Sequence, residues 1–68
     1  MTFPEHLLTL RTKQGFTQPD VASGIGIALR TYQNYERGYR EPPLSTLIAM
    51  ADFYDLDLDE LVCRERKK

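Results

Sequence analysis

The chain contains few of the residues that carry metal, redox or nucleophilic chemistry: one cysteine, one histidine and no tryptophan among 68 residues. The single cysteine, Cys63, excludes an internal disulfide framework and fits a reducing compartment, so we expect a cytoplasmic protein. The single histidine, His6, has no second ligand at metal-binding spacing, so no metal or other cofactor is predicted. Without a glycine-rich phosphate loop or the volume for a catalytic cleft, the chain is not expected to be an enzyme.

Long hydrophobic runs are missing as well. No apolar segment approaches the roughly 18 residues that a membrane-spanning helix needs, and no basic-then-apolar leader opens the chain. The composition, 41% hydrophobic and 28% charged, is that of an ordinary globular protein. We therefore expect residues 1–68 to form one soluble domain, with no membrane partner and no small-molecule ligand evident. Its core should be thin, because chains of this size bury only about 60% of their unfolded surface.

Basic charge is scarce overall, since the net charge is −1, but it is unevenly distributed. Residues 1–40 carry five basic and three acidic side chains, whereas residues 41–63 carry six acidic side chains and no basic one. The tail, residues 64–68, has a net charge of +3. Contact with a polyanion needs local positive charge, so the first half of the chain is the better candidate for such a surface.

Two threonines predict the starts of the first two helices. Thr2 is followed by a proline in the first turn and by Glu5 three residues later, which is a capping box. Thr17 stands in the same way before Pro19 and Asp20. Apolar residues then recur at helical spacing until a glycine ends each run.

Three further helices follow. Residues 29–37 are predicted to form the third, which Gly38 ends, and the paired prolines beyond it exclude a longer helix. The fourth helix is predicted to bury one apolar face, formed by Leu44, Leu47, Ile48, Ala51 and Tyr54. Asp57 can cap a fifth helix, whose apolar residues are Leu58, Leu61 and Val62. The sequence thus predicts an all-α fold of five short helices.

The segment 17–38 contains two short helices joined by only three or four residues. Helices joined so closely cross steeply, and Gly26 fits the turn while Ala22 allows the helices to approach. Tyr32 and Tyr35, three residues apart, are predicted to face the core. Such a corner holds the third helix out from the body, where it can enter the major groove of B-DNA, about 12 Å wide.

Several short motifs occur in an order that identifies a family resemblance. "TQ" opens the second helix, "YERG" closes the third, "REPP" precedes the fourth, and "LSTLIAMADFYDLDLDEL" covers the last two. With Ala22 and Gly26 at the small positions, the chain from about Phe3 to Val62 resembles the Cro and phage-repressor type of helix-turn-helix domain, the Xre family. The resemblance implies a lambda-repressor-like fold and a DNA-binding transcriptional regulator of prokaryotic or phage origin, and we expect a repressor. Members of that family mostly dock the third helix in the major groove, as dimers on two-fold sites.

The resemblance also implies which residues contact DNA. Gln18 matches a residue that touches phosphate or supports the third helix, and Arg37 and Arg40 match positions near the DNA backbone. The positions that face bases or nearby backbone are matched by Ala28, Leu29, Arg30, Gln33 and Asn34. Arg30 can form a bidentate contact to guanine and Asn34 to adenine, whereas Leu29 offers only apolar contact, as to a thymine methyl.

Arg11 and Glu36 receive a structural role from the resemblance. In similar domains the arginine of the first helix and the glutamate at the end of the third form a partly buried ion pair. A bidentate arginine–carboxylate bond would hold the third helix against the first. Arg11 is therefore expected not to touch DNA.

Three residues depart from the family pattern. Ala28 stands where serine or threonine commonly precedes the third helix, and as a poor N-cap it costs about 1 kcal/mol. Pro43 takes the usual cap position before the fourth helix. Asp55 stands where glycine or asparagine would end that helix more comfortably, because a left-handed residue is often needed there. Ala28 and Leu29 together indicate an unusual base preference.

The assembly and the partner stay open at this point. A homodimer is expected, with contacts from the fifth helix or from the loop before the fourth, and the interface candidates are Leu58, Leu61, Val62 and Cys63. The alternative function is a helix-turn-helix interaction module that pairs with a larger regulator or toxin and binds DNA weakly. The acidic net charge favours this alternative, whereas Arg30, Asn34, Arg37 and Arg40 favour DNA. The acidic run 55–60 would repel DNA, so we expect it on the face away from the duplex.

Overall fold

The computed structural model describes residues 2–62, which form five α-helices and no strand. The helices are α1 (Phe3–Lys13), α2 (Gln18–Ile25), α3 (Leu29–Arg37), α4 (Leu44–Tyr54) and α5 (Leu58–Leu61). The predicted all-α class is confirmed. Within these residues no helix is long and apolar enough to cross a membrane. Cys63 and the basic tail, residues 64–68, lie outside the described residues.

The helices begin where the sequence supplies capping residues. Thr2 and Thr17 are extended, and each side chain accepts a hydrogen bond from the backbone amide three residues later. The backbone amides of Thr2 and Thr17 in turn donate to the carboxylates of Glu5 and Asp20, so both capping boxes are complete. Asp57 begins α5 with a third capping box. These bonds satisfy amides that a helix start otherwise leaves without partners.

Left-handed residues end α2, α3 and α4. Gly26 and Gly38 have φ angles of 79° and 77°, which glycine adopts without steric cost. Asp55 ends α4 with φ of 56° and is the one non-glycine residue of 2–62 with positive φ. The expected left-handed end of α4 is thereby confirmed. Ala28 and Pro43, as expected, provide no side-chain cap for α3 and α4.

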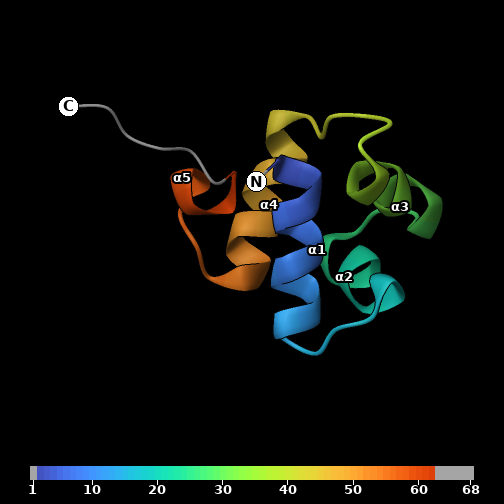
Figure 1. Cartoon of the computed structure of the whole chain (residues 1–68), viewed down its shortest axis with the longest axis horizontal. Coiled ribbons are helices and arrows are strands. Elements are labelled where there is room, and N and C mark those ends of the chain that lie inside the picture. The colour runs from blue at the N-terminus through green and yellow to red at the C-terminus, as the bar shows by residue number, and fades with distance from the viewer. Residues whose placement is uncertain (1, 63–68) are drawn as a thin grey trace.

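The helices are arranged around α1 and α4, which lie in the middle of the molecule (Figure 1). α2 and α3 lie on one side of this pair and α5 lies on the other. α1 contacts α3, α2 contacts both α3 and α4, and α4 contacts α5. The acidic helix α5 and the helix α3 are thus at opposite ends of the described domain.

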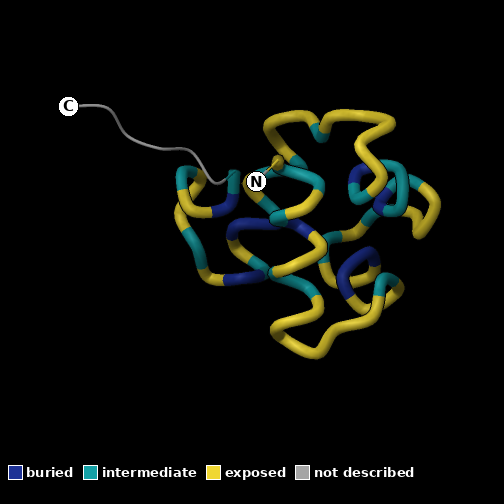
Figure 2. Tube along the Cα trace, viewed as in Figure 1, coloured by how far each residue is buried: buried dark blue, intermediate teal, exposed yellow. Residues whose placement is uncertain are grey.

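The core collects buried side chains from all five helices, while the loops before α2 and α4 are largely exposed (Figure 2). The buried side chains of the described residues are Leu7, Val21, Ala22, Tyr32, Tyr35, Met50, Ala51, Tyr54 and Leu61. Tyr32 and Tyr35 are therefore core residues, as predicted. Tyr32 is the largest fully buried side chain, so α3 is fixed to the body by its inner face.

The predicted face of α4 needs correction. Leu44 is 63% exposed and Ile48 is 45% exposed, so neither belongs to the core. The buried face instead runs through Leu47, Met50, Ala51 and Tyr54, and Met50 was not predicted. Both sets have helical spacing, and the choice is made by the neighbours of α4. α4 contacts α2 and α5, and the side that carries Met50 is the buried one.

Gly24 is a second feature that the sequence did not reveal. A Cβ atom at this position would lie 2.2 Å from Cε1 of Phe53, so α2 approaches the Phe53 ring of α4 more closely than alanine allows. The Phe53 ring is held by its own neighbours, since its centroid is 5.1 Å from those of Phe16 and Tyr54. The close approach of α2 to α4 is therefore made at Gly24.

Candidate nucleic-acid interface

α3 has two faces of opposite character. Its inner face carries the buried Tyr32 and Tyr35. Its outer face carries the side chains that the resemblance assigns to DNA, namely Leu29, Arg30, Gln33, Asn34 and Arg37. Leu29, Arg30 and Arg37 are exposed, and Gln33 and Asn34 are half-buried. Leu29 is 40% exposed although it is apolar.

The turn between α2 and α3 fixes the direction of α3. The amide of Ile27 donates to the carbonyl of Ala22 at 3.0 Å, one residue beyond the left-handed Gly26. Ile25 and Ile27, on either side of that glycine, pack against the core. Both ends of the turn are thus anchored, so α2 and α3 behave as one unit.

Arg11 and Glu36 form an ion pair between α1 and the last turn of α3. Arg11 Nε lies 2.6 Å from Glu36 Oε2, and Arg11 Nη2 donates to Glu36 Oε1 at 3.2 Å, so the contact is bidentate. The two side chains are only 14% and 6% exposed. Arg11 Nη1 also donates to the carbonyl of Phe16, at 3.0 Å. All three bonds are made to groups of the protein itself, which supports a structural role for Arg11.

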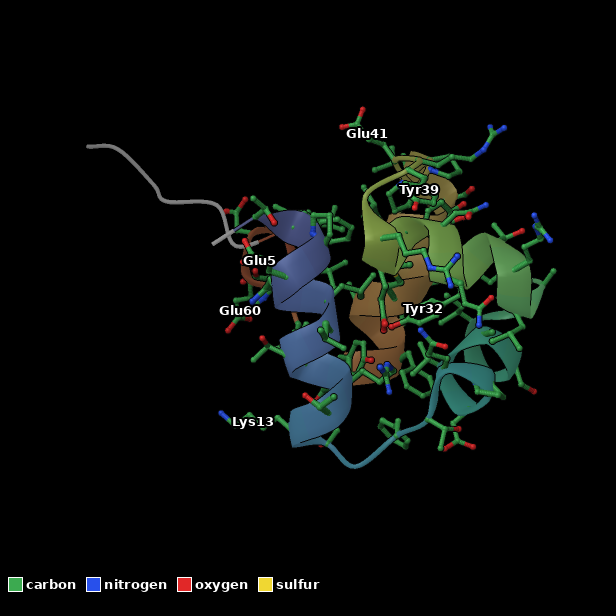
Figure 3. The ribbon with its side chains drawn as sticks, turned by 45° about the vertical axis from the view of Figure 1, so that its right-hand side comes forward. Glu5, Lys13, Tyr32, Tyr39, Glu41 and Glu60 are labelled. Carbon is green, nitrogen blue, oxygen red and sulfur yellow. The ribbon has the colours of Figure 1, made fainter. Side chains whose placement is uncertain are left out.

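Two further donors converge on the same carboxylate. The Tyr32 hydroxyl donates to Glu36 Oε2 at 2.6 Å, and the Gln18 side-chain amide donates to Oε1 at 3.0 Å. Figure 3 shows Tyr32 extending from α3 toward α1. The Tyr32 hydroxyl was not predicted to take part, although the four-residue spacing of Tyr32 and Glu36 within one helix is a signal that would have indicated it.

The electrostatic state of this cluster follows from its contacts. Burial raises the pKa of Glu36, but hydrogen bonds from Arg11, Tyr32 and Gln18 outweigh it, so the pKa lies below its usual value. Burial and the adjacent carboxylate raise the pKa of the Tyr32 hydroxyl far above its usual value. The hydrogen bond to Glu36 likewise raises the pKa of Arg11. The cluster therefore consists of a charged Arg11–Glu36 pair and a protonated tyrosine at neutral pH.

Gln18 joins this cluster to the outer face of α3. Its Oε1 atom accepts a hydrogen bond from Gln33 Nε2 at 3.1 Å, while its Nε2 atom donates to Glu36. Gln18 is half-buried at the start of α2, beside the outer face of α3. The structure therefore brings Gln18 together with Gln33 and Glu36, a grouping that the sequence did not indicate.

The remaining predicted contact residues lie at the two ends of α3. Ala28, the exposed N-cap, is next to Leu29 and Arg30. Arg40 is exposed in the loop that follows α3, beyond Arg37. The outer face of α3 and its flanks thus present three arginines and no acidic side chain between residues 28 and 40 apart from the internally paired Glu36.

The residues predicted to form the dimer interface differ in their burial. Leu61 is fully buried, so it belongs to the core of one protomer and is removed from the interface candidates. Leu58 is 38% exposed. Val62 lines a groove of about 210 Å³ together with Phe3, Glu41, Pro42 and Leu47. The lining residues come from the start of α1, the loop before α4, α4 itself and the residue that follows α5.

Glu5 and Glu60 lie away from α3, whereas the exposed Glu41 directly follows Arg40 in the loop after α3. Figure 3 shows Glu60 and Glu5 on the side of α1 opposite α3. Near this end, a His6 ring nitrogen donates to the carbonyl of Glu60 at 2.9 Å, which ties α1 to α5. No group of three or more histidine, cysteine, aspartate or glutamate side chains in residues 2–62 is arranged to hold a metal ion.

Curated proteins that are similar to this chain include transcriptional regulators from two bacteria. The HTH-type transcriptional regulator AnsR of Bacillus subtilis is 42% identical over 64 residues, which are 94% of this chain and 55% of that protein. The cryptic phage CTXphi transcriptional repressor RstR of Vibrio cholerae is 38% identical over 60 residues, which are 88% of this chain and 54% of that protein. The chain thus spans about half the length of these curated relatives.

Solved structures share the fold. The restriction-modification controller protein C.AhdI of Aeromonas hydrophila superposes with a TM-score of 0.82 at 30% identity, covering 87% of this chain and 89% of that one. A transcriptional regulator from Listeria innocua has a TM-score of 0.87 at 29% identity, covering 97% of this chain and 62% of that one. A family model described as "Helix-turn-helix" matches residues 7–61, from within α1 to the end of α5. The chain therefore belongs to the helix-turn-helix family.

Proposed function

We propose that the chain is the sequence-specific DNA-binding domain of a transcriptional repressor and that it reads the major groove with the outer face of α3. The observation that carries the proposal is the exposed outer face of α3, where arginine, amide and apolar side chains stand on a helix fixed from behind by Tyr32 and the Glu36 cluster. Base edges are read by these three kinds of side chain. The names of AnsR and RstR, a regulator and a repressor, support the same function.

The contacts divide into base reading and positioning. Arg30 is assigned to a guanine, Asn34 to an adenine and Leu29 to a thymine methyl, because these pairings match their hydrogen-bonding groups. Arg37 and Arg40 are assigned to phosphates, which fix the position of the domain without reading sequence. Ala28 lies at the end of α3 that would be deepest in the groove, where its small side chain allows close approach.

The acidic net charge is compatible with this assignment because the charges are separated in space. The acidic helix α5 lies at the opposite end of the domain from α3. Exposed charges separated by more than about 10 Å are largely screened in 0.1 M salt. The exposed charges on α3 and in the loop just after it are those of Arg30, Arg37 and Arg40, followed by the acidic Glu41.

The assembly that we propose is a homodimer, because one α3 of nine residues covers few base pairs. The exposed apolar side chains Leu44, Ile48 and Leu58, together with the Val62 groove, are candidates for contact with a second copy. Sedimentation velocity of the wild type and of Leu58→Glu tests this. A concentration-dependent dimer weakened by the substitution supports it, and a monomer at all concentrations, with DNA present, overturns it.

The function is tested by selecting bound sequences from a randomised duplex library. The wild type is compared with an Arg30→Ala/Asn34→Ala double variant and with Lys13→Ala, which removes one positive charge from the far end of α1. We expect the wild type and Lys13→Ala to enrich two related half-sites, whose spacing reports the dimer geometry. The double variant should lose or alter that enrichment.

The opposite outcome favours a different function. If the wild type enriches no sequence at low salt, the chain is better described as a protein-interaction module that pairs with a larger regulator or toxin. The acidic net charge of −1 is the observation that supports this second candidate. Affinity that is insensitive to salt would favour it too, because phosphate contacts release counterions and an apolar protein interface does not.

A further inference from the structure

The side-chain amides of Gln18 and Gln33 form a chain that starts at Glu36. Gln18 Nε2 donates to Glu36 Oε1 at 3.0 Å, and Gln33 Nε2 donates to Gln18 Oε1 at 3.1 Å. The chain leads from a carboxylate that is 6% exposed to a half-buried side chain on the outer face of α3. It joins α2 to both the end and the middle of α3.

The direction of this chain is dictated by hydrogen-bonding valence. An ionised carboxylate only accepts, so the end of Gln18 that faces Glu36 must be its NH2 group. The Oε1 atom of Gln18 then faces Gln33 and requires a donor, which only the NH2 group of Gln33 can supply. Glu36 stays an acceptor only, because Arg11 and Tyr32 also donate to its carboxylate.

We propose that Glu36, acting through Gln18, fixes the orientation of the Gln33 amide and so determines the hydrogen-bonding groups that Gln33 shows to the base edges. Glu36 and Gln18 are positioning residues in this scheme, and Gln33 is the residue that reads. The proposal rests on the DNA-binding function proposed above.

The fixed orientation has a defined chemical consequence. Within residues 2–62 the Gln33 Oε1 atom accepts no hydrogen bond, and one hydrogen of its NH2 group is left over after the bond to Gln18. Gln33 therefore offers an acceptor together with one donor. Adenine presents the matching pair, an N6 donor beside an N7 acceptor, and cytosine presents the N4 donor alone. We expect a preference for adenine, then cytosine, at the base that Gln33 meets.

Glu36→Gln is expected to reverse the direction of the hydrogen bonds from Gln33 to Gln18 and from Gln18 to residue 36. The new amide keeps its oxygen where Oε2 accepts from Arg11 Nε and Tyr32 at 2.6 Å each, because those are the shortest bonds of the cluster. Its NH2 group then faces Gln18 and also Arg11 Nη2, whose 3.2 Å bond to Oε1 is lost. Gln18 must turn its oxygen inward and its NH2 group toward Gln33. Gln33 would turn in the same way and present donors, so the preference should move toward guanine or thymine, which carry acceptors.

Gln18→Met provides the test that does not disturb the ion pair. Methionine has nearly the same length and helix propensity as glutamine, but it lacks the amide that bonds Glu36 and Gln33. We expect it to flatten the preference at the Gln33 base by about tenfold, leaving the preference at the Arg30 base unchanged. The matched control is Gln14→Met, the same substitution at the exposed C-cap of α1.

The measurement is binding-site selection with the wild type, Gln18→Met, Glu36→Gln and Gln14→Met, with thermal melting of each. NMR of the free wild type adds a readout without DNA, because the Gln33 side-chain NH2 protons should show contacts to Gln18 that Gln18→Met abolishes. A preference lost at one base pair supports the proposal, and its reversal in Glu36→Gln, where that variant folds, supports it further.

Three results overturn the proposal. A uniform loss of affinity over all sequences, with a lower salt dependence, would make Gln18 a phosphate contact only. An unchanged preference in a folded Gln18→Met would show that Gln33 needs no positioning. A wild type that selects no sequence would overturn the DNA-binding function itself, and the NMR contacts would then describe a purely structural bond.

Discussion

Glu36 is the residue on which most of the polar structure of the domain depends. Its carboxylate is 6% exposed and accepts from Arg11, Tyr32 and Gln18. A buried charge is expensive unless it is paired and its remaining lone pairs are satisfied. Here one cation and two neutral donors supply that compensation from three different helices, so the cluster links α1, α2 and α3 at one point.

Removing the cation of this cluster should destabilise the domain strongly. Arg11→Ala leaves the Glu36 carboxylate buried without its counter-charge, and we expect a loss of about 3 kcal/mol in the free energy of unfolding. In a domain of this size that lowers the Tm by about 10 °C or more. Thermal melting of Arg11→Ala beside Lys13→Ala, an exposed cation two residues away, measures the difference. An unchanged Tm with abolished DNA binding would instead make Arg11 a DNA contact.

The same cluster should make the domain less stable as the pH falls into the acid range. The Glu36 pKa in the folded protein lies below the usual 4.5, so the unfolded chain takes up the proton first. The stabilisation is complete above pH 4.5 and is lost as the pH falls through the folded pKa. We expect the Tm of the wild type to fall more steeply below pH 4.5 than that of Glu36→Gln, with Glu41→Gln as the exposed control.

The Tm of Glu36→Gln should still fall to some extent as the pH is lowered. Hydrogen bonds from the backbone of Thr2 and Thr17 hold the pKa of Glu5 and of Asp20 below their usual values, and both capping boxes remain in the variant. If Glu36→Gln melts with the same pH profile as the wild type, the carboxylate of Glu36 does not carry the acid sensitivity.

At the scale of elements, the position of α3 depends on how α2 is held against α4. α2 contacts α3 and α4, and its first residue belongs to the Glu36 cluster. On the other side, Gly24 lies against the ring of Phe53 in α4. A shift of α2 would therefore move the Gln18 amide and α3 together.

Gly24→Ala tests that contact. Alanine is favoured over glycine in a helix by about 1 kcal/mol, so propensity alone predicts a gain. The added Cβ would however lie 2.2 Å from the Phe53 ring, and overpacking costs about 1–3 kcal/mol. We expect a lower Tm for Gly24→Ala and an equal or higher Tm for Ser23→Ala, its exposed neighbour in the same helix. A stabilised Gly24→Ala would mean that the ring yields without cost.

At the start of α3 a substitution is expected to stabilise the domain. Ala28 is extended, with φ of −67° and ψ of 147°, and makes no side-chain cap. Ala28→Ser should cap α3 and raise the free energy of unfolding by about 1 kcal/mol. Ala28→Val is the matched control, because valine at an N-cap is as poor as alanine. Denaturant unfolding of the three proteins measures the gain, and equal midpoints for all three would contradict it.

For the whole molecule, the separation of charge between α3 and α5 explains how an acidic chain can approach DNA. The exposed arginines of residues 2–62, Arg30, Arg37 and Arg40, lie on and after α3, and the acidic helix α5 lies at the other end. The proposed complex then depends on a few local phosphate contacts. Its affinity should vary with salt in proportion to that small number, and not with net charge.

Arg37→Ala and Arg40→Ala should each lower the slope of log K against log salt by about 0.9, because each removes one phosphate contact. Affinity should fall about equally for specific and unrelated duplexes. Lys13→Ala removes the same charge from the far end of α1 and should leave the slope unchanged. Titrations at several salt concentrations check this, and equal slopes for all three variants would assign the effect to net charge.

Local signals predicted the elements well. The capping boxes after Thr2 and Thr17 and the glycines at 26 and 38 placed the helix ends, because capping depends on residues three or four apart. The inner face of α3 followed from the spacing of Tyr32 and Tyr35. Leu44 and Leu61 were misjudged or left undecided, because periodicity shows that a face is apolar but not which neighbour covers it.

The sequence by itself therefore determined the five helices, their ends and the family, since these follow from contacts within a few residues and from motif order. Only the tertiary structure decided which α4 face is buried, how closely α2 meets Phe53, and that Gln18, Gln33 and Glu36 share one hydrogen-bonded chain. Those outcomes depend on side chains 15 or more residues apart, and no local pattern specifies the distance or direction between them.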